Sequence, residues 1–308
     1  MKKIYLLLLI ALLTVSCKQA GSRQAKGNDD RPIITVTIDP LRYFTEAIAG
    51  DRFTVVSMVP KGSSPETYDP TPQQLIDLAK SKAYFRIGHI GFEQTWIDKL
   101  TDNAPHLQFF DTSQGVDLIY DNSHPHIHHE GDGKESAEEH HHAGGVEPHI
   151  WNSAINAQII ADNILTALCT IDKPNEALYM ERYKDLCGQI ERTDSLVRTL
   201  LADPSADHAF MIYHPALSYF ARDYGLHQIP IEAGGKEPSP AHLKELINTC
   251  KQEKVRVIFV QPEFDRRNAD LIAQQTGTEV IGINPLAYDW KVEMLNTAKA
   301  LIPTPRTP

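Results

Sequence analysis

Short apolar strands alternate with amphipathic helices along this chain, and this alternation restricts its fold more than any other feature. The first half is predicted to form strands at residues 33–38, 53–59, 83–87 and 107–110. Helices lie between them, and Asp39-Pro40 and Thr71-Pro72 carry the signals of helix starts. Strands that alternate with helices in this way are typical of parallel βαβ units.

The same alternation returns in the second half. Strands are predicted at residues 209–213, 228–231, 255–260 and 279–283, and helices at residues 216–224, 239–250, 267–275 and 290–302. Two longer helices, at 153–170 and 175–201, separate the halves. With 308 residues the chain exceeds the usual size of one domain. We therefore predict an α/β protein of two Rossmann-like lobes, each with a parallel sheet, joined by a long rigid helix.

These patterns also set the expected boundaries. We assign residues 1–17 to a lipoprotein signal peptide, 18–31 to a polar tether, 32–150 to the N-terminal lobe, 151–173 to the linking helix and 174–308 to the C-terminal lobe. The N-terminal lobe contains a His-rich loop at residues 124–145.

The N-terminus has the pattern of an export signal. Lys2 and Lys3 precede the apolar run Ile4–Leu13, which is too short to span a bilayer as a mature helix. Val15-Ser16 before Cys17 indicates lipidation of the Cys17 sulfur, whereas a cleaved signal with a free thiol is the alternative. We expect a lipid-anchored, periplasm-facing protein of the cell envelope. The net charge of −10 gives no support to nucleic-acid binding.

Three further cysteines follow Cys17. Cys169, Cys187 and Cys250 are an odd number, so at least one thiol is predicted to stay free. The helix spacing of Cys169 and Cys187 places them beyond disulfide reach. All three are expected to be buried small apolar residues, and no function is assigned to them.

Half of the chain's 14 histidines gather in one short stretch before residue 145. They are His124, His126, His128, His129, His140, His141 and His142. Acidic residues and glycines separate them, and apolar side chains are almost absent, so this loop cannot form a core. Imidazole suits zinc, copper and nickel ions, so the loop is predicted to be an accessory metal trap. A polar linker whose charge follows pH is the alternative.

Candidate metal ligands follow the predicted strands, where ligands sit in open parallel sheets. They are Glu66, His149, His214, Asn284 and Asp289. Two histidines and one or more oxygen donors from both lobes could surround one ion in a cleft. His89 also follows a strand end, although a surface or supporting role fits it better.

Several segments, in this order, resemble the metal-specific solute-binding lipoproteins of ABC transporters, especially those for zinc and manganese. The segments are VPKGSSPETYDPTPQ (59–73), EPHIW (147–151), HPALSYFARDYGL (214–226), EPSP (237–240) and NPLAYDW (284–290). The similarity covers residues 33–301, and the His-rich insertion resembles the zinc branch. The resemblance implies a fold of two Rossmann-like lobes bridged by a rigid helix. It also implies that the protein is a monomer and that its partners are ABC permease and ATPase subunits.

The resemblance also implies the ligand set. His149 and His214 fall on histidine ligands of the family. Glu66 stands where the family normally has histidine, and Asn284 where it commonly has aspartate. Asp289 or a water could supply the missing donor. Carboxylates favour manganese or iron, whereas the Irving–Williams order and the His-rich loop favour Zn²⁺ over Mn²⁺.

Two other classes of function are alternatives to metal capture. Two histidines, a carboxylate and a water also describe a catalytic zinc site, but the sequence contains no H-E-x-x-H motif and no evident general base. A surface adhesin or a storage protein is a further alternative, with no direct sequence signal. No G-x-G-x-x-G or Walker A motif is present, so ATP is assigned to partner subunits.

Overall fold

The computed structural model describes residues 31–120 and 145–303. The predicted signal peptide with Cys17, the tether up to residue 30, and His124 to His142 lie outside the described residues. The predictions made for them therefore remain predictions.

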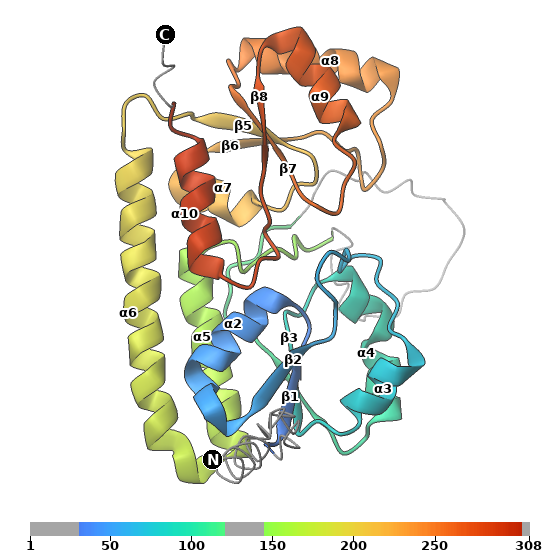
Figure 1. The fold of residues 1–308 in the computed structure, drawn as a ribbon, viewed down its shortest axis with the longest axis vertical. Helices are drawn as coiled ribbons and strands as arrows, with labels where there is room; N and C mark the ends of the chain where they lie inside the picture. Colours follow the sequence, from blue (N-terminus) through green and yellow to red (C-terminus); the bar gives the residue numbers. More distant parts are fainter. Residues whose placement is uncertain (1–30, 121–144, 304–308) are drawn as a thin grey trace, which may run out of the picture. The chain divides into compact units, whose positions relative to one another are not determined.

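The N-terminal lobe is built on a four-stranded parallel sheet (Figure 1). Its strands are β1 (Ile33–Val36), β2 (Thr54–Ser57), β3 (Ala83–Arg86) and β4 (Gln108–Asp111), in the order β2-β1-β3-β4. The helices of this lobe are α2 (Asp39–Ala49), α3 (Pro72–Leu78) and α4 (Gly91–Asn103). The carboxyl ends of all four strands meet at one edge of the sheet.

The C-terminal lobe repeats this arrangement. Its strands are β5 (Ala209–Ile212), β6 (His227–Pro230), β7 (Val257–Val260) and β8 (Glu279–Gly282), all parallel, in the order β6-β5-β7-β8. The helices are α7 (Ser218–Tyr224), α8 (Pro240–Gln252), α9 (Arg267–Thr276) and α10 (Trp290–Ala300). The predicted fold of two parallel α/β lobes is confirmed.

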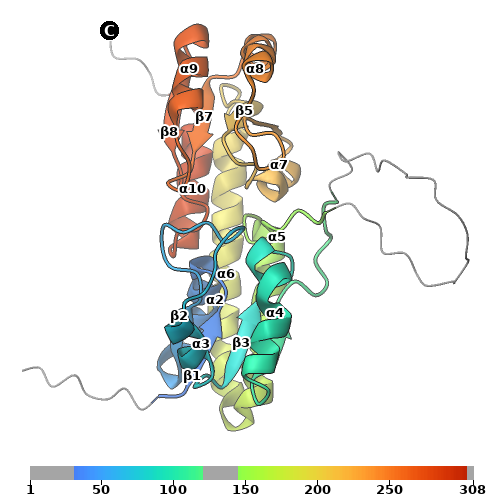
Figure 2. The same ribbon diagram turned by 90° about the vertical axis from the view of Figure 1, so that its right-hand side faces the viewer.

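Two long helices connect the lobes. The segment 151–173, predicted as the linking helix, contains α5 (Ala154–Ile171), which packs against α2 and α6. A short 3₁₀ turn leads from it into α6 (Glu176–Leu201). Helix α6 contacts α2 of the first lobe and α10 of the second, and Figures 1 and 2 show it running beside both. The bridging role therefore belongs to the second of the two long helices.

Helix α5 is long and apolar enough to cross a membrane by composition, but half of it is buried inside the protein. Ala157, Ile160, Ala161, Ile164 and Leu168 are all at most 1% exposed. This apolar face packs in the core that the sheet of the N-terminal lobe shares with α2 and α6, so α5 is a core helix.

Local signals in the sequence start several of these helices. Thr71 forms a capping box with Gln74, and Ser153 and Ser239 accept backbone N–H groups of α5 and α8. Each such cap stabilises a helix by about 1 kcal/mol. Asp39 was expected to be a cap, but it lies inside the first turn of α2, where its carboxylate accepts from Ser57 Oγ at 2.5 Å.

Two tryptophans connect the segment before α5 to the C-terminal lobe. Trp151 is fully buried, and its Nε1–H donates to Pro285 O at 2.8 Å. Trp290 Nε1–H donates in return to Trp151 O at 2.6 Å. The segment that carries His149 is therefore held against the loop that precedes α10.

The cysteines agree with the sequence only in part. Cys169, Cys187 and Cys250 are all free thiols. Cys250 is buried as expected, whereas Cys169 and Cys187 are only half-buried.

A buried carboxyl group organises the turn between β3 and α4. Glu93 is 1% exposed, and it accepts hydrogen bonds from Thr37 Oγ1, from Ile87 N at 2.8 Å and from Gly88 N at 2.5 Å. Burial raises the pKa of Glu93 to about 7, although these hydrogen bonds oppose the rise. The turn that leads to the start of α4 is therefore fixed from inside the lobe.

This buried acid predicts a specific pH dependence. The pKa of Glu93 is higher in the folded than in the unfolded chain, so its favourable contribution is complete below about pH 4.5 and is lost as pH rises to about 7. We expect Glu93→Gln to remove this loss, which is on the order of 3 kcal/mol. Urea unfolding at several pH values from 4.5 to 8 measures it. Glu181→Gln, at an exposed position of α6, should follow the parent. Parallel pH curves for all three proteins would contradict this account.

Candidate metal centre

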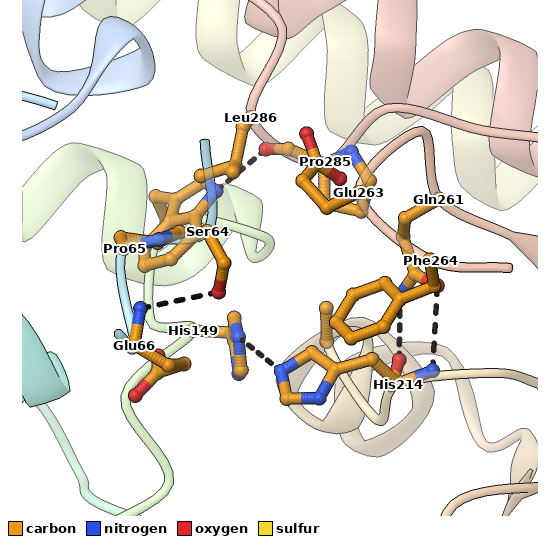
Figure 3. Close-up of a pocket in the computed structure, with 12 residues that line it drawn as sticks. Ser64, Pro65, Glu66, His149, His214, Gln261, Glu263, Phe264, Pro285 and Leu286 are labelled. Atoms are coloured by element: carbon orange, nitrogen blue, oxygen red, sulfur yellow. Dashed lines mark hydrogen bonds between the residues drawn. The ribbon is translucent and has the colours of Figure 1, made fainter. Parts of the chain in front are cut away.

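Two imidazole rings meet in a pocket between the lobes. His149 lies just before α5, and His214 directly follows β5. Their Nε2 atoms are 3.2 Å apart, with ring centroids at 5.0 Å and an angle of 73° between the planes. Figure 3 shows the pair in the middle of the pocket. The structure thus brings together the two histidines that sequence analysis selected.

A carboxylate holds the far nitrogen of each ring. Glu232, directly after β6, accepts from His214 Nδ1 at 2.8 Å, and Glu147 accepts from His149 Nδ1. Both glutamates are themselves largely buried. A proton on Nδ1 leaves the Nε2 lone pair free to bind a cation, and carboxylate partners make imidazole a stronger ligand. The orientation of both rings is therefore set.

Burial and charge together set the pKa values of His149 and Glu147. Burial disfavours the protonated form of His149, but the charge and hydrogen bond of Glu147 outweigh it, so the pKa of His149 is raised. Burial alone would raise the pKa of Glu147, yet the interaction with His149 lowers it. The negative potential that favours a proton on this imidazole also favours a metal cation in its place.

Glu66 contributes a carboxylate from the N-terminal lobe. Its Oε2 accepts from the backbone N–H of Gly91 at 3.1 Å, at the start of α4, where the helix dipole favours negative charge. Its Oε1 is buried and has no hydrogen-bond partner. A buried acceptor without a partner is costly, and a cation ligated there would satisfy it. Glu66 therefore fits a metal-binding role.

Apolar and aromatic side chains enclose these groups. Phe264 stacks on His214 with centroids at 5.1 Å and an angle of 16°, and Trp151 lies at 5.3 Å from His149. Pro285 and Leu286 complete this part of the lining. Such walls exclude water and strengthen electrostatic interactions inside the pocket.

The other predicted site residues lie elsewhere. The side chain of Asn284 accepts from Leu286 N at 3.1 Å, and it lines a neighbouring hollow rather than the histidine pocket. The Asp289 carboxylate caps α10 by accepting from Val292 N at 3.2 Å. His89 is also outside the lining of the histidine pocket, and burial lowers its pKa. None of the three is positioned beside the histidine pair.

Sequence reasoning missed four residues of this site. Glu147 and Glu232 orient the histidines, Gln261 binds the backbone of His214, and Glu263 lines the pocket. Burial raises the pKa of Glu263, against the charge of His214. Glu232, Gln261 and Glu263 all follow the strand ends of β6 and β7, so the rule that selected His214 could have found them.

The histidine pair by itself is not a complete metal site. Within residues 31–120 and 145–303, no group of three His, Cys, Asp or Glu side chains already stands in ligating geometry. The two imidazoles are the fixed part of the site. Glu66 lies on the His149 side of the pair (Figure 3), and Glu263 lines the same pocket.

Comparison with known proteins shows the family of this chain. A model of the family described as "Zinc-uptake complex component A periplasmic" (ZnuA) matches residues 34–294. The chain belongs to this family. It is 27% identical over 306 residues to the high-affinity zinc uptake system protein ZnuA of Bacillus subtilis (strain 168), covering 94% of this chain and 86% of that protein.

A second relative concerns another metal. The iron ABC transporter substrate-binding lipoprotein MtsA of Streptococcus pyogenes serotype M6 (strain ATCC BAA-946 / MGAS10394) is 28% identical, over 91% of this chain and 88% of its own. Among solved structures, a crystal structure of ZnuA matches with a TM-score of 0.78 and 33% identity, covering 88% of this chain and 97% of the other. ZnuA family members thus share the fold and nearly the full length.

The close contact between Gly91 and Glu66 predicts that a methyl group added at residue 91 destabilises the protein. A Cβ at Gly91 would lie 2.5 Å from Glu66 O and 2.9 Å from Glu66 Oε2. We expect Gly91→Ala to displace Glu66 and to lower the free energy of unfolding by about 1–3 kcal/mol. Gly282→Ala is the control, because a Cβ there meets nothing within 4 Å. Denaturant unfolding of both variants tests this, and equal stabilities would contradict the predicted clash.

Proposed function

We propose that this protein is the extracytoplasmic zinc-binding component of an ABC importer, which holds one ion between its lobes and delivers it to a permease. The observation that carries the proposal is the facing pair of Nε2 atoms, each backed by a buried carboxylate. The membership of the ZnuA family and the zinc-uptake relative support it. The family supplies the binding component of a transport system, and an enzymatic role has no support from it.

The charge of the pocket favours a dication as cargo. Glu66 and Glu263 line it with the two histidines, Glu147 and Glu232 stand behind them, and no lysine or arginine is among the described lining residues. Such an environment disfavours anionic solutes. Imidazole nitrogens with a carboxylate are a usual donor set for zinc, and the Irving–Williams order places Zn²⁺ above Mn²⁺.

Manganese or iron is the second candidate. Glu66 supplies oxygen where a third imidazole would make the site softer, and oxygen donors suit these harder ions. The iron-transporter relative supports the same alternative. Zinc is preferred here because two nitrogen donors are already positioned.

Delivery of the ion would involve partner subunits, a membrane anchor and a means of release. Permease and ATPase subunits would be the partners of a monomeric protein that a lipid on Cys17 anchors at the outer face of a membrane. The His-rich residues 124–145 would act as an accessory zinc trap. Helix α6 packs against both lobes, so ion release would use small local movements instead of a wide hinge opening.

Replacing the histidines tests the proposed site. We expect His149→Ala and His214→Ala each to weaken zinc binding by roughly a hundredfold or more, because a ligand contributes at least as much as its supporting partner. Chelator competition with the chain from residue 18 to 308 measures affinity and stoichiometry. Zinc and manganese are titrated side by side, with and without residues 124–145.

The matched control replaces two histidines outside the pocket, the exposed His227 on β6 and the half-buried His242 on α8. This double variant should bind zinc as the parent does. Retention of tight 1:1 zinc binding by the double variant of His149 and His214 would exclude the proposed site. Tighter binding of manganese than of zinc by the parent would instead favour the second candidate.

The supporting carboxylates give a graded prediction. We expect Glu147→Gln and Glu232→Gln each to lower zinc affinity by about 10–100-fold, because an amide still accepts from Nδ1 but does not increase the basicity of the ring. Isothermal titration calorimetry at constant pH measures the affinity and the number of protons released. An unchanged affinity in both variants would mean that these carboxylates do not support the ligands.

A further inference from the structure

The proposed zinc site lacks a fourth protein donor. His149, His214 and Glu66 supply two nitrogens and one oxygen, whereas protein zinc sites are usually tetrahedral. Asn284 and Asp289, the two candidates from sequence, are occupied by backbone N–H groups of the loop before α10 and of α10 itself. The remaining position therefore has to be filled by another described residue or by water.

Glu263 is the carboxylate best placed to fill it. It lines the same pocket as both histidines and Glu66. It also lines the neighbouring hollow, together with Asp39 and Ser63 of the N-terminal lobe. Glu263 thus stands where two cavities between the lobes adjoin. Within residues 31–120 and 145–303 its carboxylate receives no hydrogen bond from another residue and forms no ion pair; it accepts only from its own backbone N–H and interacts with the charge of His214.

The turn that carries Glu263 is attached to one of the histidine ligands. Gln261 Nε2 donates to His214 O at 2.6 Å, and its Oε1 accepts from His214 N at 3.3 Å. Phe264 N donates to Gln261 O at 3.2 Å, which closes the turn, and the Phe264 ring stacks on His214. The residues on both sides of Glu263 are therefore fixed relative to His214.

The side chain itself can move while this turn stays in place. Three rotatable bonds separate the Glu263 carboxylate from its backbone, and the site has no preformed group of three ligands among the described residues. From these observations we infer that Glu263 is the fourth donor, which swings from the junction of the two cavities onto an ion held by His149 and His214. This inference rests on the proposed metal-binding function.

Two carboxylates would change the selectivity of the site. With Glu66 and Glu263 as ligands, the charge of a divalent cation is balanced, and two of the four donors are oxygens. Hard ions depend on carboxylates more than zinc does. Glu263 would therefore allow manganese or iron to bind as well, and its loss would make the site more selective for zinc.

The test compares Glu263→Gln with Glu279→Gln. Glu279 is an exposed glutamate at the start of β8, at the opposite end of the same sheet. We expect Glu263→Gln to weaken zinc binding at least about tenfold and manganese binding more, so that the zinc-to-manganese affinity ratio rises. Glu279→Gln should match the parent in both. Thermal unfolding of the metal-free proteins confirms that each variant is folded.

The visible spectrum of bound cobalt(II) shows whether Glu263 binds the metal directly or only supports the site. Exchange of a carboxylate ligand changes the visible spectrum of a bound cobalt ion, whereas a change outside the ligand set leaves it nearly unaltered. We expect an altered spectrum for Glu263→Gln only. An unchanged spectrum with parental affinities would assign the fourth position to water and overturn the inference, although the proposed function would stand. Absence of tight binding in the parent would overturn both.

Discussion

The site depends on two nitrogen atoms that are brought within 3.2 Å of each other from distant parts of the chain. Packing against Phe264 and Trp151 holds the two rings only in part, and a hydrogen bond to the second nitrogen fixes the direction in which Nε2 points. Glu147 and Glu232 provide that second contact. Both glutamates are largely buried, and such groups are costly unless hydrogen-bonded. Each imidazole therefore satisfies its glutamate, and each glutamate fixes its imidazole.

The fold brings these groups together through the geometry of parallel sheets. The carboxyl ends of β5, β6 and β7 lie at one edge, so His214, Glu232 and Glu263 are neighbours although they are far apart in sequence. The N-terminal lobe contributes Glu66 from the loop after β2. His149 enters from the connecting segment, which Trp151 holds against the loop before α10. Three independent parts of the chain thus converge on one pocket.

Much of this architecture could be predicted, because hydrophobic periodicity and capping residues are local signals. The strands, the helices and the caps at Thr71, Ser153 and Ser239 all depend on such local signals. His214 was selected at a strand end, and His149 at the end of the His-rich loop. The roles of Asn284 and Asp289 could not be predicted in this way, since a short polar side chain can either bind a metal ion or accept a hydrogen bond from a nearby backbone N–H group. Only the backbone of the loop before α10 decides between these roles.

The distribution of donors over the lobes also determines how an ion could be released. Glu66 belongs to one lobe and His214 with Glu263 to the other, so a bound ion would connect the lobes through its own coordination bonds. The free energy of binding is then partly a free energy of lobe closure. Helix α6 and the contacts between Trp151 and Trp290 oppose a wide opening. A permease would therefore need only to withdraw one movable carboxylate, since losing one of four donors weakens the site while the histidine pair stays in place.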